Sequence, residues 1–296
     1  MIRKHFGPDT PHISEFYENV HMLFLNVHPV FEGIRPVPPT VVYTGGLHQK
    51  PIKELPVDLL SYLDSSKNGV IYTSFGTNVK PDGIATHVLK KIVKVLSEVP
   101  YDVLLKWDED DLPGRSDNIR ISKWLPQSDL LRHPKIKLFI TQAGLQSTDE
   151  AITAGVPLIG IPMLGDQWFN AERYEYHKIG FKIEPNTLEE EQLKNAISTV
   201  IEDNSYRQNV IKLRTLMYDQ PMGPLERAVW WTEHVLRHGG ARHLRAPDAN
   251  MSWWQYLELN LVLTLLISLL ILVFIFISLV YFVCINYVTS KKLKAA

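Results

Sequence analysis

Short apolar runs alternate with amphipathic stretches along most of the chain between residues 69 and 183. The run Val70 to Phe75 is rich in β-branched and aromatic residues and ends at Gly76-Thr77, a pattern typical of a strand that leads into a turn. The same kind of pattern predicts five more strands. They lie over Asp102–Trp107, Ile119–Ser122, a segment that ends at Thr141, Val156–Met163, and Phe181–Ile183.

Helical patterns fall between and after these strands. From Asp82 to about Val99, apolar residues recur every three or four positions. Thr187 to Glu190 has the capping-box form that begins a helix. Alternation of strands and helices over about 170 residues predicts a doubly wound parallel sheet of the α/β class. The other expected helices lie over Pro126–Leu131, after Gly144, after Gln167 towards Tyr176, and over Ser205–Met217 and Pro224–Arg237.

A second pattern begins at Leu259. No charged residue occurs from Leu259 to Ser290. The stretch 261–285 is almost continuously Leu, Ile, Val and Phe. At ~1.5 Å per residue it is longer than a hydrocarbon core of ~30 Å. Aromatic residues flank it as they do at membrane interfaces. The sequence therefore predicts a transmembrane helix over 261–285.

Composition adds only limits to this picture. The chain has 296 residues, 45% of them hydrophobic, which allows one or two domains with a sizeable core. A net charge of −1 argues against a general nucleic-acid binder. The single cysteine, Cys284, lies in the apolar run, so no disulfide within the chain is expected. No apolar signal-peptide core follows Met1.

The stretch from Phe139 to Gln167 reads FITQAGLQSTDEAITAGVPLIGIPMLGDQ. Its order is strand, polar turn, helix, strand and loop. In parallel α/β sheets such units place their turns at the carboxyl ends of the strands, where ligands bind, and direct a helix N-terminus towards them. Phosphate is the ligand that suits this arrangement best. No GxGxxG follows any strand, which argues against an ordinary dinucleotide-binding domain.

This stretch resembles, nearly position for position, the donor-binding signature of the membrane-bound UDP-glycosyltransferases. That signature is a hydrophobic pair, Thr or Ser, His or Gln, a small residue, Gly, Ser, an acid, two Pro, and Asp-Gln. The resemblance implies a GT-B type C-terminal donor-binding domain, a doubly wound parallel sheet, followed by one transmembrane helix. The matching residues are Phe139, Ile140, Thr141, Gln142, Ala143, Gly144, Ser147, Glu150, Pro157, Pro162, Asp166 and Gln167.

The resemblance also assigns roles in binding a UDP-sugar. A flat surface for uracil, acceptors for the ribose, N–H donors for the diphosphate and a polar fork for the sugar are needed. Metal and cofactor are not implied, because the UDP-sugar is a co-substrate. The implied residues are Trp124 and Gln127 for uracil, Glu150 for ribose, Ser74, Gly76, Thr77, Gln142, Gly144 and Ser147 for the diphosphate, and Asp166 and Gln167 for the sugar.

Several of these residues have simpler readings. The less favoured alternative for Trp124 is a core aromatic, and Asp166 is well placed to cap the helix that follows it. Gln142 stands where most relatives have His, so its phosphate contact is expected to be weaker and independent of pH. A neutral hydrogen bond contributes ~0.5–1.5 kcal/mol, against ~1.5–3 kcal/mol for one to a charged group.

Two other groups of residues have the form of metal sites, and we favour plainer interpretations of both. Asp108-Glu109-Asp110 contains the DxD pattern of metal-dependent glycosyltransferases, but further acidic and turn residues follow, which favours a solvated surface loop. His234 and His238 are four apart on an expected helix without an intervening Glu, which favours a polar helix face.

The family places its catalytic base, a His oriented by an Asp, in an N-terminal acceptor domain. None of His5, His12, His21 and His28 stands in that context, so no catalytic residue is assigned. We expect 1–45 to be a remnant of the acceptor domain with its linker, 46–240 the donor-binding domain, 241–260 a juxtamembrane segment and 286–296 a short basic cytosolic tail. The chain alone is then expected to be inactive.

The expected function is transfer of a hexose, glucose rather than glucuronate, from a UDP-sugar to a hydroxyl of a small lipophilic acceptor with inversion. The alternative is a non-catalytic truncated membrane partner of full-length transferases, and association with itself or with such relatives is a further expectation. The sequence does not identify the acceptor.

The expected location is the endoplasmic reticulum membrane, with a single pass and a luminal donor domain. Lys291, Lys292 and Lys294 follow the apolar run, and the last five residues have the KxKxx form of retrieval signals. Asn250-Met251-Ser252 is a glycosylation sequon close to the membrane.

Overall fold

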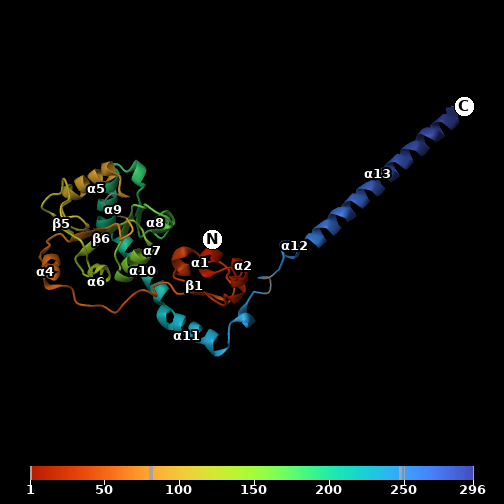
Figure 1. Ribbon diagram of the computed structural model, residues 1–296. Helices are drawn as coiled ribbons and strands as arrows, with labels where there is room; N and C mark the ends of the chain where they lie inside the picture. The colour runs from red at the N-terminus through yellow and green to blue at the C-terminus, as the bar shows by residue number, and fades with distance from the viewer. Residues whose placement is uncertain (1, 80–82, 247–248, 250, 296) are drawn as a thin grey trace. The chain divides into compact units, whose positions relative to one another are not determined.

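The computed structural model describes residues 2–79, 83–246, 249 and 251–295. Its contacts divide the chain into two compact units, Met1–Ala241 and Arg242–Ala296. The first unit contains the sheet and its helices, and the second contains the long apolar helix (Figure 1). The finer boundaries at residues 45, 240, 260 and 285 stay predictions.

Within the described residues, six parallel strands form the central sheet in the order β5-β4-β3-β6-β7-β8. The predicted doubly wound sheet is confirmed, with most strand ends within one or two residues of expectation. The order reverses between β3 and β6, and such a reversal opens a crevice at the carboxyl ends of the strands. The strands are β3 (Val70–Ser74), β4 (Asp102–Lys106), β5 (Ile119–Ser122), β6 (Ile136–Thr141), β7 (Leu158–Gly160) and β8 (Gly180–Lys182).

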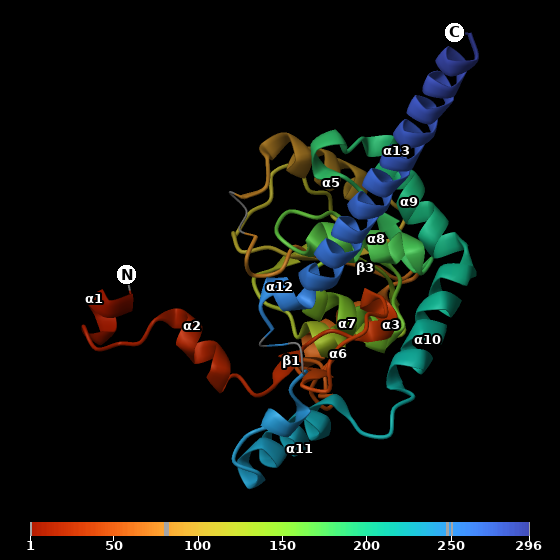
Figure 2. The same cartoon turned by 90° about the vertical axis from the view of Figure 1, so that its right-hand side faces the viewer.

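Helices cover both faces of this sheet, as Figures 1 and 2 show. On one face, α5 and α9 pack on Ile71, Leu105 and Ile140. On the other, α4, α6, α7, α8 and α10 pack on Tyr72 and Phe139. Neighbouring residues of one strand therefore enter different cores, as the two-residue period of a strand requires. These helices are α4 (Val57–Ser65), α5 (Thr86–Glu98), α6 (Gln127–Leu131), α7 (Leu145–Ala154), α8 (Gln167–Tyr176), α9 (Glu190–Glu202), α10 (Asn204–Tyr218) and α11 (Pro224–Arg237), which follows them.

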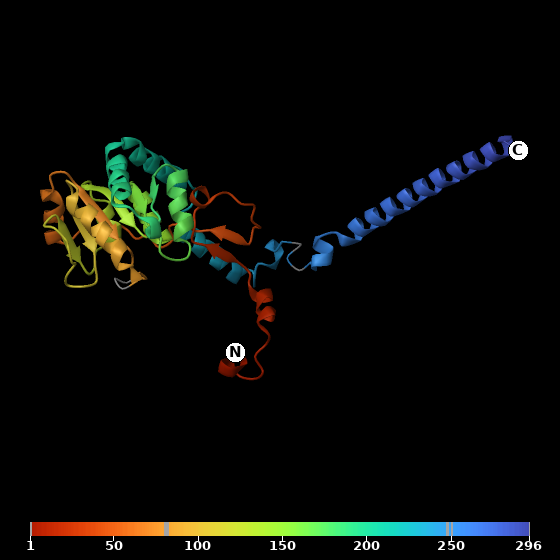
Figure 3. The same cartoon turned by 90° about the horizontal axis from the view of Figure 1, so that it is seen from above.

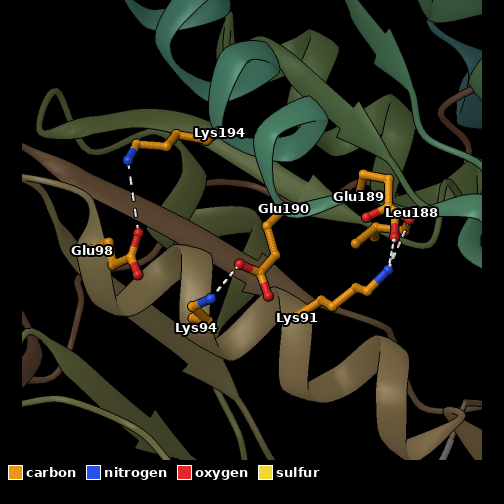
Figure 4. Close-up of polar contacts among 7 residues, drawn as sticks. All are labelled: Lys91, Lys94, Glu98, Leu188, Glu189, Glu190 and Lys194. Carbon is orange, nitrogen blue, oxygen red and sulfur yellow. Dashed lines mark hydrogen bonds and ion pairs between the residues drawn. The ribbon is translucent and has the colours of Figure 1, made fainter.

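The capping box expected at Thr187 is wrong. Thr187 lies in a short 3-10 helix, η3 (Pro185–Thr187), and α9 begins at Glu190 with Glu189 in the N-cap position. The two glutamates instead meet lysines of α5, with Glu189 Oε1 3.1 Å from Lys91 Nζ and Glu190 Oε2 paired with Lys94 (Figure 4). The start of α9 therefore has no side-chain cap of its own and forms ion pairs with α5 instead.

Before the sheet, the chain forms short elements. The strands β1 (Leu23–Leu25) and β2 (Val41–Tyr43) pair in parallel as a separate two-stranded sheet. Between them, α3 (Pro29–Glu32) places Phe31 in the core against α8, where Arg173 Nε donates to the Phe31 carbonyl at 2.7 Å. Part of the segment expected to be a linker thus belongs to the packed unit. The helices α1 (Ile2–Phe6) and α2 (Ile13–Phe16) and the 3-10 helix η1 (Tyr17–Asn19) precede β1.

The second unit contains η4 (Arg242–Leu244), α12 (Trp253–Tyr256) and α13 (Leu259–Ala295). Figure 3 shows α13 as one unbroken helix. Among the described residues, its stretch Leu259–Tyr287 is the one helix long and apolar enough to cross a membrane, with a mean hydropathy of 3.1. It contains the predicted span 261–285. Asn250 of the sequon lies outside the described residues.

Candidate functional site

The site predicted from the sequence lies where the strand order reverses, at the carboxyl ends of β3 and β6. The turn after β3 includes Gly76 with φ +76°, and the turn after β6 includes Ala143 with φ +68°. Positive φ is common for glycine and rare for alanine, so the backbone at Ala143 is held in an unusual conformation. Directly after this turn, Gly144 is the N-cap of α7, so the N-terminus of α7 lies near the carboxyl end of β6.

Gln142 occupies the space between the two turns. Its side chain is buried, and its Oε1 accepts a hydrogen bond from Thr141 Oγ1 at 2.9 Å. A Cβ added to Gly144 would lie 3.2 Å from Gln142 Nε2, and one added to Gly76 would collide with the same atom. The glycines therefore allow the amide nitrogen to sit against both turns.

Three of the predicted residues form one hydrogen-bonded group at the start of α7. Gln127 Nε2 donates to Ser147 Oγ at 2.9 Å and to Glu150 Oε2 at 2.7 Å. Tyr72, on β3, completes the group by donating from its hydroxyl to Gln127 Oε1 at 3.0 Å. Burial raises the pKa of Tyr72, which keeps this hydroxyl protonated as a donor. The structure thus brings together α6, α7 and β3.

Trp124 lies on the loop between β5 and α6, three residues before Gln127. Its side chain is 72% exposed, so the alternative of a core aromatic is wrong. The Ser122 hydroxyl donates to the Trp124 carbonyl at 2.9 Å and supports the loop. An exposed indole at a strand end offers a flat apolar surface to a ligand.

The last two residues of the signature, Asp166 and Gln167, lie at the start of α8. Asp166 stands in the N-cap position, but its side chain makes no capping bond and instead accepts from Asn170 Nδ2 at 2.9 Å. Asn170 also donates to the Ala143 carbonyl at 2.9 Å. Gln167 is buried, and its Oε1 accepts from the N–H groups of Met163 and Leu164, each at 2.7 Å. These two bonds use the oxygen of the amide and not its nitrogen.

The turn after β3 is less organised. Ser74 is buried at the end of the strand and its Oγ accepts from the Gly76 N–H at 3.3 Å. Thr77 is exposed. These residues lie at the same sheet edge as Gln142, with the Gly76 turn against the Gln142 amide.

Sequence reasoning missed the supporting residues Tyr72 and Asn170. Tyr72 gave no signal, because a tyrosine in a strand is an ordinary core residue. Asn170 did give one: it stands four residues after Asp166 on a helix, where side chains meet. It also missed Asp149, a buried carboxyl group beside Glu150 whose pKa is raised by burial to about 7.

The acidic loop and the histidine pair have other partners. Asp108 pairs with Lys106 at 2.7 Å, and Asp110 pairs with Lys123 at 2.6 Å, which holds the pKa of Asp110 below its ordinary value. The ring of His234 lies 5.4 Å from that of Trp230 and 4.6 Å from that of His238. In the described part of the chain, no three His, Cys, Asp or Glu side chains are grouped as metal ligands.

Comparison with known proteins identifies the family. The model of the UDP-glucoronosyl and UDP-glucosyl transferase family matches residues 8–294. The chain belongs to this family. It is 40% identical over 276 residues to the ecdysteroid UDP-glucosyltransferase of Spodoptera littoralis nuclear polyhedrosis virus, which covers 90% of this chain and 54% of the viral protein. It is also 40% identical over 233 residues to human UDP-glucuronosyltransferase 2B15, covering 78% of this chain and 44% of the human protein.

The chain therefore spans about half the length of the curated relatives it matches. Among solved structures, it resembles a UDP-glucose:anthocyanidin 3-O-glucosyltransferase in complex with UDP, with a TM-score of 0.57, 20% identity, and coverage of 73% of this chain and 53% of that one. It also resembles the glycosyltransferase of kitacinnamycin, with a TM-score of 0.60, 18% identity, and coverage of 72% and 55%. These similarities show the GT-B fold of a glycosyltransferase.

Proposed function

We propose that the sheet edge at β3 and β6 binds a UDP-sugar, and that it is the donor half of a transferase that moves glucose, with inversion, to a hydroxyl of a small lipophilic acceptor. The observation that carries the proposal is the bonded group of Gln127, Ser147 and Glu150. The residue matched to uracil donates to the residues matched to phosphate and to ribose, so all three lie together near the N-terminus of α7. One nucleotide bound there would lie beside all of them.

The start of α7 supplies the phosphate subsite in this proposal. The first N–H groups of a helix have no partner within it, and the helix dipole favours an anion there by ~0.3–1 kcal/mol or more. Because Ser147 Oγ accepts from Gln127, its own proton remains for a phosphate oxygen. As the sugar departs, negative charge grows on the leaving UDP, and donors already in position stabilise it.

No metal is needed in this proposal. The N–H groups of the helix N-terminus, the Ser147 hydroxyl and the Gln142 amide stabilise the negative charge of the diphosphate by donating hydrogen bonds. The two aspartates of the DxD loop, Asp108 and Asp110, each form an ion pair with a lysine. Treatment with EDTA is therefore expected to leave UDP affinity unchanged.

The sugar subsite contains Asp166, which is exposed, and the Gln167 amide. A carboxylate accepts from sugar hydroxyls and an amide donates to them, which suits neighbouring hydroxyl groups. Asp166 would also repel the carboxylate of glucuronate, since no cation is assigned to this subsite. We therefore favour UDP-glucose over UDP-glucuronate.

We assign no residue of the chain as the catalytic base, and expect the 296 residues alone to bind the donor without transferring the sugar. We further propose that the protein resides in the membrane of the endoplasmic reticulum through α13, with the donor unit in the lumen. The basic residues Lys291, Lys292 and Lys294 after the apolar stretch support this orientation.

Calorimetry of the full chain in nonionic detergent tests donor binding. UDP and UDP-glucose are expected to bind at one site, and UDP-glucuronate more weakly. Trp124→Ala is expected to lower UDP affinity about tenfold or more, because stacking of a base on an aromatic ring contributes ~1–3 kcal/mol. The matched control is Trp253→Ala, which removes an equally exposed indole from the second unit. Failure of the wild-type chain to bind UDP would sink the proposal.

The second candidate is a non-catalytic membrane partner of full-length transferases. It is favoured by α11, none of whose 14 residues is buried in the described structure. Its exposed apolar residues include Leu225, Val229, Trp230 and Leu236. Co-purification of the chain with a full-length relative, lost when Trp230 and Leu236 are both replaced by serine, would favour this role. Equal recovery of the variant would exclude α11 as the contact.

A further inference from the structure

Tyr72 is a buried tyrosine in the middle of β3 whose hydroxyl reaches the residues of the candidate site. Its side chain is 1% exposed. Its ring stacks on that of Phe139 on β6, with the ring centroids 4.8 Å apart and the planes 8° from parallel. The two residues are also partners in the register of the sheet. The position of the Tyr72 hydroxyl is therefore fixed by two paired strands rather than by a loop.

The Tyr72 hydroxyl and the Glu150 carboxylate together determine which way the Gln127 amide faces. The hydroxyl donates to Gln127 Oε1 at 3.0 Å, and Gln127 Nε2 donates to Glu150 Oε2 at 2.7 Å. If the amide were turned over, its oxygen would lie against a carboxylate, which only accepts. Burial raises the pKa of Tyr72, and so does the charge of Glu150, so the hydroxyl keeps the proton that it donates.

Both N–H bonds of the Gln127 amide are used within the protein. One donates to Glu150 Oε2 and the other to Ser147 Oγ, at 2.9 Å. The amide of glutamine has only two such hydrogens, so none remains for the carbonyl oxygens of uracil. The Gln127 side chain is thus suited to holding Ser147 and Glu150 in position rather than to recognising those oxygens of the base.

Gln127 depends on these contacts because α6 is short. The helix has five residues, and Pro126 in the N-cap position makes no side-chain capping bond. An isolated helix of this length is not stable in water. Gln127 is also partly exposed, so burial alone does not fix its side chain. The hydroxyl of Tyr72 therefore supplies the contact that ties the start of α6 to the central sheet.

Glu150 keeps one oxygen for a ligand. The bond from Gln127 uses Oε2, whereas Oε1 has no partner among the described residues and is not buried. A carboxylate oxygen accepts from hydroxyl groups. A site that bonds a substrate hydroxyl discriminates against an analogue that lacks it. The 2′-hydroxyl of a ribonucleotide is such a group.

We infer that Tyr72 is a positioning residue for the ribose: through the Gln127 amide, it holds Glu150 where one carboxylate oxygen meets the 2′-hydroxyl of the nucleotide. This inference rests on the proposed binding of UDP. It gives a strand residue that touches no ligand a part in selecting UDP over 2′-deoxy-UDP. Tyr72→Phe keeps the stacked ring and removes only the hydroxyl, so it isolates this part.

Calorimetry of the full chain in nonionic detergent compares UDP with 2′-deoxy-UDP. The wild type is expected to bind UDP about tenfold more tightly, the usual order for one hydrogen bond to a charged group. Tyr72→Phe is expected to reduce this ratio at least about threefold. The matched control is Tyr174→Phe, which removes an equally buried hydroxyl bonded to Thr148 of α7. It is expected to keep the wild-type ratio. A role in stability alone would lower Tm in both variants and change neither ratio.

Gln127→Met provides a second test, in case Tyr72→Phe does not fold. It removes the amide through which Tyr72 acts and is expected to reduce the ratio to a similar extent. Adding Tyr72→Phe to Gln127→Met leaves no hydroxyl without a partner, so this double variant is the less disruptive one. It is expected to reduce the ratio no further, because the two residues act as one unit. If Gln127 recognised uracil instead, Gln127→Met would weaken both nucleotides equally.

Three results would overturn the inference: no preference for UDP in the wild type, an unchanged ratio in Tyr72→Phe or Gln127→Met, or a further loss in the double variant. Failure of the wild type to bind UDP at all would overturn the proposed function together with this inference. UDP binding with a ratio that the variants do not change would overturn the inference alone.

Discussion

At the scale of single residues, one amide holds the turn after β3 against the turn after β6. Gln142 Nε2 lies close to the Cβ positions of both Gly76 and Gly144. Its Oε1 is engaged by the Thr141 hydroxyl, which leaves the two N–H bonds of the amide on the side of the turns. In the proposed site, the Gln142 amide is a neutral donor to the diphosphate. It can occupy this position because Gly76 and Gly144 have no side chain.

Gly76→Ala tests this arrangement. The added Cβ would collide with Gln142 Nε2 and push the amide away, while φ +76° adds strain of about 1–2 kcal/mol. We expect UDP affinity to fall about tenfold, measured by calorimetry. The matched control is Gly114→Ala, which has a similar φ of +85° but no atom within 4 Å of its Cβ position. It is expected to lose a similar amount of stability and no affinity. Equal UDP affinity in both variants would show that the Gln142 position does not matter.

At the scale of elements, three ion pairs connect α5 with the start of α9 and differ in how exposed their lysines are (Figure 4). Lys91 Nζ donates to the Leu188 carbonyl at 2.7 Å as well as to Glu189, and its side chain is partly buried. Lys94 pairs with Glu190 in solvent, which raises the pKa of Lys94. Only the first lysine satisfies a backbone carbonyl just before α9.

We therefore expect the two lysines to differ in their contribution to stability. Lys91→Met is expected to cost about 1 kcal/mol and lower Tm by about 2–4 °C, because a carbonyl loses its donor. Lys94→Met is expected to change Tm by less than about 1 °C, since exposed pairs contribute little. Thermal unfolding at low and high salt measures both. A larger effect for Lys94, or a loss of the Lys91 effect in high salt, would mean that charge alone determines this contact.

The same elements show what the sequence can and cannot predict. Apolar runs located β3 to β8, because strands covered on both faces must be hydrophobic along their length. The capping box at Thr187 was wrong because the chain forms a 3-10 helix there and α9 begins at Glu190. Glu189 and Glu190 pair with lysines of α5, about 100 residues earlier, which a local pattern does not contain. The resemblance named Gln127, Ser147 and Glu150 as candidates, but did not predict that Gln127 donates to both of the others. Asp149 gave no signal in the sequence, because nothing local to it on α7 predicts its burial.

At the scale of the whole molecule, the second unit contains a long apolar helix that is a candidate to cross a membrane. The stretch Leu259–Tyr287 has 29 residues and exposes nearly all of its apolar side chains. At ~1.5 Å per residue it extends roughly 43 Å, longer than a hydrocarbon core of ~30 Å. A bilayer is the environment that covers such a helix. The orientation then determines whether the donor unit meets luminal or cytosolic UDP-sugars.

A new glycosylation site tests the proposed luminal orientation. Gly114 is exposed, and its φ of +85° is better tolerated by Asn than by most residues. Gly114→Asn, with Arg115 and Ser116, creates an Asn-Arg-Ser sequon far along the chain from the membrane helix. Introduced into the endogenous gene, it is expected to add a glycan, seen as a mobility shift that endoglycosidase reverses.

Adding Ser116→Ala to the same protein is the control, because it keeps the asparagine and removes the sequon. The shift is expected to disappear. Since an accessible sequon can still escape modification, protease added to intact microsomes supplies the decisive comparison. A luminal donor unit is protected until detergent opens the vesicles, because protease cannot cross the bilayer. Digestion of this unit in sealed vesicles would place it in the cytosol, and the basic residues after the apolar stretch would then have to lie in the lumen, against the usual distribution of lysine and arginine.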